Sequence, residues 1–233
     1  DNYGSDAVSR QQIFQPAIDT ANNGYVVGVT FKEELDSEYT GIAANETLSN
    51  IYLDESGLPY EVGDVIKNPD LAKTLQLIAD GGKDAFYTGD MAQAMVDAVA
   101  AWGGNMTMED LANYEVKVRE PVVGHYKDYT IYSLPPASSG GTHLVEILNI
   151  LENYDDMDKI GVNSAEYVHR FSEAFKIAFA DRAQYMADTD FADVPLAQLT
   201  SKDYAAERYS EITDKSGSYV AVEPEELEHY ATT

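Results

Sequence analysis

The spacing of apolar residues changes along the chain, and this change limits the folds that the sequence can adopt. Before residue 114, apolar residues such as Leu71, Leu75 and Ile78 recur every three or four positions, which is the period of an amphipathic helix. Between 114 and 135 apolar and polar residues alternate, which is typical of a strand. The helical period returns after 136. The sequence therefore predicts an α+β chain that is mostly helical and contains one β-hairpin.

Local end signals support several of the helices. The pattern predicts a helix over 9–23 that stops before Gly24, and Asn68-Pro69 opens another that ends at Gly81-Gly82. The run 107–110 is a capping-box pattern that begins a short helix. A long helix is predicted over about 163–186. One stripe of this helix is expected to contain Val168, Phe171, Phe175, Ala178, Phe179 and Arg182.

The hairpin is predicted from two alternating runs. Val116 and Val118 alternate with charged residues and form the first predicted strand, and residues 129–134 form the second. A break at 124–128 is expected to be the turn. Pro121 has no N–H group, so it places the first strand near a sheet edge or near its own end.

The chain shows no internal repeat and no clear linker, so we expect a single fragment over 1–233. Within it, 1–113 is expected to be mainly helical, 114–135 to be the β-hairpin, 136–213 to be helical, and 214–233 to be an acidic tail.

Composition removes several classes of function. The 41 acidic residues against 15 basic ones give a formal charge of −26, which repels nucleic-acid backbones and anionic lipid. There is no cysteine, so disulfides, thiolate zinc sites and cysteine nucleophiles are excluded. No apolar run approaches the roughly 20 residues that span a membrane. We expect neither a nucleic-acid partner nor a membrane span in this chain.

The loop Ser138-Ser139-Gly140-Gly141 lies between a predicted strand and a predicted helix. The free N–H groups of a helix N-terminus could bind an anion there. The loop has neither the lysine of a phosphate-binding P-loop nor the glycine spacing of a dinucleotide site. A helix cap with close backbone packing is therefore the favoured interpretation.

The other polar candidates are also weak. His169 and Glu173 are one helical turn apart and could share a metal, but no third ligand completes a site. His125 and His143 are expected to be ordinary hydrogen-bonded histidines. The aspartates lack the spacing of a calcium loop and favour a capped turn; they are Asp188, Asp190 and Asp193. No nucleophile-elbow pattern occurs, and no cofactor or metal is predicted.

One stretch carries a resemblance to a known family. Residues 132–154 read YSLPPASSGGTHLVEILNILENY, with paired prolines, Ser-Ser-Gly-Gly and a leucine-rich helix. This run resembles the large-subunit signature of the γ-glutamyltransferase (γ-glutamyltranspeptidase) family. Flanking segments, among them GDVIKNPDLAKTLQLIADGGKDAFYTGDMA and AFADRAQYMADTDFADVPLAQLTSKDYA, resemble the same family in the same order.

The resemblance implies a fold and a chemistry. The parent would be an N-terminal-nucleophile hydrolase with an αββα sandwich, cut from a precursor into a large and a small subunit. Family members are cut before a Thr-Thr-His motif, so Thr232 matches the catalytic nucleophile and Thr233 follows it. The implied substrates are γ-glutamyl amides such as glutathione, the partner is the small subunit, and the location is secreted or periplasmic.

The resemblance also implies limits. None of the five arginines matches the family motif that holds the substrate carboxylate, and Thr232 is still joined to Ala231. We therefore expect the chain alone to be inactive. Two alternatives stay open: a relative acting on acylated cephalosporins or poly-γ-glutamate, and a stand-alone acidic helical domain for binding or scaffolding. The family hypothesis predicts exposed apolar patches where a partner packs.

Overall fold

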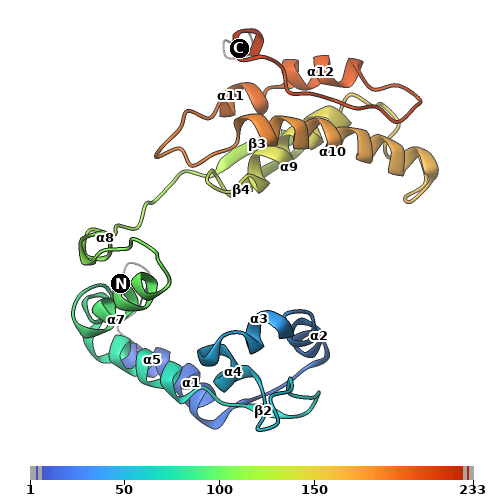
Figure 1. Ribbon diagram of the computed structural model, residues 1–233. Coiled ribbons are helices and arrows are strands. Elements are labelled where there is room, and N and C mark those ends of the chain that lie inside the picture. Colours follow the sequence, from blue (N-terminus) through green and yellow to red (C-terminus); the bar gives the residue numbers. More distant parts are fainter. Residues whose placement is uncertain (1–3, 5–6, 228–229, 231–233) are drawn as a thin grey trace. The chain divides into compact units, whose positions relative to one another are not determined.

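The computed structural model describes residue 4, residues 7–227 and residue 230, and it divides into two compact units, 1–116 and 117–233. Figure 1 shows the elements of each unit. Among the described residues, no helix combines the length and the apolar character needed to cross a bilayer. The mostly helical α+β class predicted from the sequence is what the structure has.

The first unit is almost entirely helical. Its elements are α1 (Arg10–Asn23), β1 (Tyr25–Val26), α2 (Val29–Ser37), α3 (Tyr39–Ala43), α4 (Glu46–Tyr52), β2 (Val65–Ile66), α5 (Pro69–Gly81), α6 (Lys83–Tyr87), α7 (Asp90–Ala101) and α8 (Met108–Ala112). The short strands β1 and β2 pair antiparallel, with Tyr25 opposite Ile66. One core lies between α1 and α5, and a second is built from residues of 27–66.

The predicted helix ends of this unit are confirmed in detail. Ser9 caps α1 and forms a capping box with Gln12, and the Asn68 side chain accepts a hydrogen bond from the backbone N–H of Leu71 at the start of α5. Thr107 and Asp110 form the second capping box, at α8. These caps satisfy N–H groups that no intrahelical carbonyl can reach.

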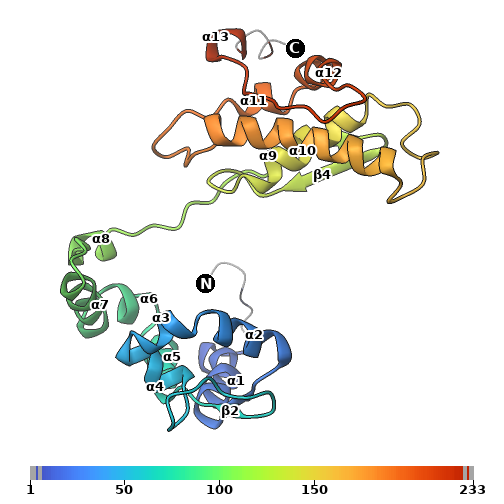
Figure 2. The same ribbon diagram turned by 45° about the vertical axis from the view of Figure 1, so that its right-hand side comes forward.

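The second unit is built around one central helix, which Figure 2 shows from a second direction. Its elements are β3 (Val122–Tyr126), β4 (Tyr129–Ser133), α9 (Gly140–Leu151), α10 (Ala165–Tyr185), α11 (Leu196–Leu199), α12 (Lys202–Ser210) and α13 (Pro224–Leu227). Helices α10 and α12 and the β3–β4 hairpin all pack against α9. A Cβ atom at Gly124 would lie 2.5 Å from Val145, so a glycine lets β3 approach α9 closely.

The hairpin is present, but its first strand lies further along the chain than predicted. Val122 pairs with Ser133 and Tyr126 pairs with Tyr129. Val116 and Val118 alternate as a strand would, yet they are exposed and outside any strand. Because Pro121 cannot donate a ladder hydrogen bond, pairing begins at the next residue.

The predicted stripe of α10 is only partly buried. Val168, Phe175 and Phe179 are between 44% and 54% exposed. The buried residues of the helix are instead Arg170, Glu173, Ala174, Ile177, Ala178 and Asp181. Aromatic residues at helical spacing indicate an apolar face, but they do not say which partner covers that face.

Candidate functional site

The Ser-Ser-Gly-Gly loop is held by contacts with its own unit. A Cβ atom at Gly141 would lie 2.2 Å from the carbonyl oxygen of Leu134. The Ser139 hydroxyl accepts a hydrogen bond from Arg182 Nε at 3.1 Å, and its carbonyl oxygen lies 2.5 Å from His143 Nδ1. These contacts favour the interpretation of the loop as framework, with a glycine where the chain after β4 passes close to the start of α9. The close packing is as expected, but Ser139 makes no side-chain cap hydrogen bond.

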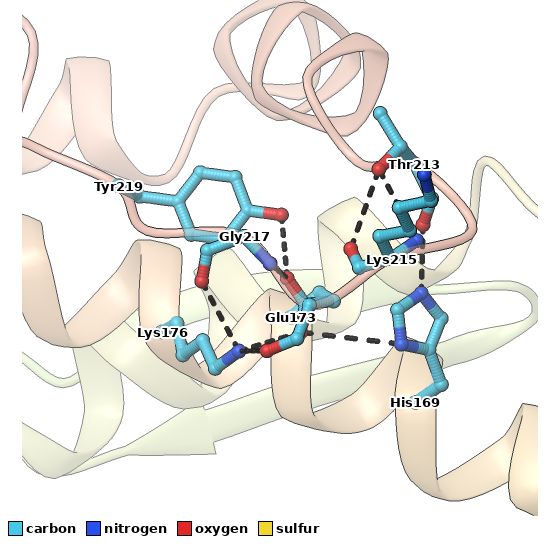
Figure 3. A network of polar contacts seen from close by, with 8 residues as sticks. His169, Glu173, Lys176, Thr213, Lys215, Gly217 and Tyr219 are labelled. Carbon is cyan, nitrogen blue, oxygen red and sulfur yellow. Dashed lines mark hydrogen bonds and ion pairs between the residues drawn. The ribbon is translucent and has the colours of Figure 1, made fainter.

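His169 and Glu173 do come together, but as part of a hydrogen-bond network rather than a metal site (Figure 3). His169 Nε2 lies 2.7 Å from the carbonyl oxygen of Thr213, and its Nδ1 lies 4.0 Å from the Glu173 carboxylate. Among the described residues, no group of three or more histidine, aspartate or glutamate side chains is placed to hold a metal ion.

The Glu173 carboxylate receives three donors although its side chain is only 1% exposed. Lys176 Nζ donates at 2.7 Å, the Tyr219 hydroxyl at 2.7 Å and the Gly217 backbone N–H at 2.8 Å. Burial alone would raise the pKa of Glu173, but the hydrogen bonds from Lys176, Tyr219 and Gly217 outweigh it and lower the pKa to about 2. This charged carboxylate therefore fastens the loop 213–219 to α10.

The aspartates after α10 form a capped turn. The Asp188 side chain accepts a hydrogen bond from the backbone N–H of Asp190, as in an Asx-turn. Arg119 supplies the cation, at 2.8 Å from Asp190 and 3.5 Å from Asp188. Asp193 is exposed. Two of the three aspartates considered for a calcium loop, Asp188 and Asp190, are thus paired with an arginine.

Thr232, the predicted catalytic nucleophile, lies outside the described residues. The segment that leads toward it is described as far as Leu227, and again at Tyr230. The ring of Tyr230 packs edge-on against Tyr204, with centroids 5.2 Å apart, and its hydroxyl donates to Glu207. Leu227 is buried with Tyr204 in one apolar cluster.

One polar cluster was missed from the sequence. Glu146 in α9 and Asp181 in α10 are both fully buried, beside Tyr204 and Arg208 of α12. Glu146 stands in the run LVEILNIL, where a glutamate suggests an exposed position. Its position between apolar neighbours in this run was the only signal available.

The sequence of the chain was compared with a protein family and with curated proteins. The chain matches the family described as Gamma-glutamyltranspeptidase along residues 1–233. It is 40% identical over 88% of its length to the glutathione hydrolase proenzyme of Escherichia coli K12, covering 35% of that protein. It is 42% identical over 84% of its length to the acylase ACY 1 proenzyme of Pseudomonas sp. SE83, again covering 35%. The chain thus spans about a third of the curated relatives it matches.

The solved structures agree with the sequence match. The γ-glutamyltranspeptidase of Helicobacter pylori superimposes with a TM-score of 0.86 at 38% identity, over 93% of this chain and 61% of that one. The cephalosporin acylase of Bacillus halodurans superimposes with a TM-score of 0.76 at 29% identity, over 86% of this chain and 38% of the acylase.

Proposed function

Because the chain belongs to the γ-glutamyltranspeptidase family, we propose that it is part of a proenzyme that cleaves γ-glutamyl amides such as glutathione. The observation that carries the proposal is the family match along all 233 residues, together with 40% identity to a glutathione hydrolase proenzyme. The γ-glutamyl group would pass to water or to an amino acid.

Thr232 is the proposed nucleophile, freed when the precursor cuts itself between Ala231 and Thr232. The Thr232 hydroxyl oxygen would bond to the γ-carbonyl carbon while its α-amine accepts the hydroxyl proton. The C–N bond would then break, and the proton would leave with the departing amine. Before cleavage the nitrogen of Thr232 is a peptide nitrogen and cannot act as a base, so the uncut chain would be inactive.

A second subunit from the same precursor is the proposed partner. The second unit exposes large apolar side chains on α10 and on the hairpin, among them Phe175, Phe179, Tyr129 and Tyr132. A face of this kind supports a packing partner. We also propose an exported or periplasmic location, with which the absence of cysteine is compatible.

The test is to express the complete gene and to measure two outcomes, precursor cleavage and release of the chromophore from a γ-glutamyl anilide. Thr232→Ala should abolish both. Thr47→Ala, an exposed position on α4, should change neither. The proposal fails if wild type releases no chromophore, or if Thr232→Ala still cleaves itself and keeps full activity.

A second substrate class is supported by one observation. Identity to the acylase ACY 1 proenzyme is 42%, as high as identity to the glutathione hydrolase of Escherichia coli. The same preparation should therefore be assayed with an acylated cephalosporin. Faster turnover of the cephalosporin than of the γ-glutamyl anilide would favour the acylase, and it would leave the assignment of Thr232 intact.

A further inference from the structure

Helix α9 carries polar side chains into the core of the second unit. Thr142, Glu146 and Asn149 are at most 2% exposed and follow one another along one face of the helix. Among them Glu146 is ionisable, and both of its carboxylate oxygens lack a hydrogen-bond partner among the described residues. A buried carboxyl group without a donor is costly, so this residue needs an explanation.

Asp181 of α10 faces Glu146 and is equally buried. The Tyr204 hydroxyl donates to Asp181 Oδ2 at 2.7 Å, while Asp181 Oδ1 has no described donor. The two carboxyl groups together thus present four oxygens to one donor. If both were ionised, two like charges would lie side by side out of water, which is strongly unfavourable.

Arg208 lies close to the pair but directs its hydrogen bonds elsewhere. Its Nη1 donates to Glu211 and its Nη2 to the carbonyl oxygen of Val220, both at 2.8 Å, and its Nε has no described partner. Burial, followed by the neighbouring Asp181 carboxyl group, raises the pKa of Glu146 well above its ordinary value, and the charge of Arg208 opposes this. No described titratable group of α11 or of the hairpin interacts with Glu146.

We propose that Glu146 and Asp181 share a single proton, and that this carboxyl pair acts through Tyr204 and Arg208 to keep the segment 220–227 docked on α12. A protonated Glu146 donates to Asp181 Oδ1, which leaves one negative charge and one donor more. Both Asp181 oxygens then have a donor, and Glu146 keeps one neutral carbonyl oxygen in place of a buried negative charge.

The link from the pair to the segment runs through two side chains of α12. Arg208 holds the carbonyl oxygen of Val220, and Tyr204 packs with Leu227 in a buried cluster that Val222 and Tyr230 also contact. When the proton leaves, the second negative charge attracts the Arg208 guanidinium. In the proposed switch this attraction draws the guanidinium toward the pair and weakens the hydrogen bond from Arg208 Nη2 to the carbonyl oxygen of Val220. The predicted consequence is that the segment loosens as the pH rises.

The direction with pH follows from proton counting. Above about pH 4.5 the unfolded chain has released the Glu146 proton, while the folded chain keeps it. The folding equilibrium therefore weakens about tenfold per pH unit, until the pair also releases its proton. The stabilisation that the retained Glu146 proton gives to the folded state is complete below the ordinary glutamate pKa. It is lost as the pH rises through the raised pKa that Glu146 has in the folded chain.

Glu146→Gln provides the test, because an amide offers Asp181 a permanent donor of nearly the same shape. The matched control is Glu120→Gln, which removes an exposed carboxylate from the same unit. All three proteins are expressed from the complete gene. Amide hydrogen exchange is followed by mass spectrometry in peptides covering 218–227 as a function of pH, and infrared spectra are recorded for the carbonyl stretch of a protonated carboxyl group.

In wild type and Glu120→Gln, protection of 218–227 should fall by up to tenfold per pH unit above the ordinary glutamate pKa. In Glu146→Gln it should stay constant, and the protonated-carboxyl band should disappear. Parallel exchange profiles in all three proteins, or a band that survives in Glu146→Gln, would overturn the proposal. A profile that shifts with the identity of the alkali cation at fixed ionic strength would also overturn it, since a bound cation would then replace the proton.

Asp181→Asn gives an independent reading if Glu146→Gln does not fold. This variant keeps Glu146 and places the donor on the other partner. It should likewise lose the infrared band and the pH dependence, and retention of both would contradict a shared proton.

Discussion

Replacing Glu173 by glutamine should destabilise the second unit by about 2 kcal/mol at neutral pH. The folded pKa of about 2, against an ordinary 4.5, corresponds to roughly 3 kcal/mol of preference for the charged carboxylate. Lys176, one of its three donors, is 39% exposed, so solvent screens that ion pair and reduces the figure. Loss of hydrogen bonds to a charged acceptor gives a similar magnitude, about 1.5–3 kcal/mol.

The pH dependence distinguishes this effect from a simple packing defect. A carboxyl group whose folded pKa is depressed stabilises the protein above its unfolded pKa, and it loses that contribution as the pH falls toward the folded pKa. The stability difference between wild type and Glu173→Gln should therefore be full at pH 7. It should shrink below about pH 4.5 and approach zero near pH 2.

The assay is denaturant unfolding of the protein from the complete gene, followed over a series of pH values. Tyr219→Phe removes one of the three donors and should cost about 1 kcal/mol. Glu120→Gln, an exposed carboxylate, should have little effect. A difference between wild type and Glu173→Gln that is independent of pH would refute the reasoning, because the cost would then come from packing and not from the charge.

Three further outcomes are expected. Gly141→Ala should lower the melting temperature and reduce the free energy of unfolding by about 1–3 kcal/mol or more, because its Cβ would lie 2.2 Å from the Leu134 carbonyl oxygen. The matched control, Gly140→Ala, meets no such contact and should change the free energy of unfolding only slightly. Arg119→Ala should cost no more than about 1 kcal/mol in unfolding experiments, because its ion pairs with two aspartates are partly exposed. Added sodium chloride should raise the melting temperature, since it screens repulsion within a chain of formal charge −26; a falling melting temperature would contradict this.

Local chemistry was predicted well from the sequence. The predicted helix starts at Asn68 and at Thr107 each depend on residues within three positions of one another, and both are present. Ser9 was predicted only as the first residue of a helix, and it is the residue that caps α1. The strand at Val116 was misplaced because alternation alone does not say where a pairing partner begins. Pro121 carried that information, and it was assigned only an edge role.

The candidate sites depended on contacts that sequence spacing does not encode. His169 and Glu173 were correctly placed on one helix face, but the donors that explain Glu173 come from a loop more than 40 residues away. Glu146 becomes informative only when Asp181 is known to face it. Thr232 is assigned as a candidate through resemblance alone, because no pattern within the chain distinguishes it from other threonines.

Two sites that involve buried carboxyl groups of α10, Glu173 and Asp181, accommodate these acidic groups in different ways. Glu173 receives three donors, one of them a lysine, and stays ionised. Asp181 and Glu146 have one described donor between them, so a proton shared by the two carboxyl groups removes one of the two buried charges. The two sites respond to pH in opposite directions: Glu173 loses its contribution in acid, and the shared proton is lost in base. Together they should give the second unit its greatest stability just above the ordinary glutamate pKa. In Glu146→Gln the stability should stay high at pH values where that of wild type has begun to fall.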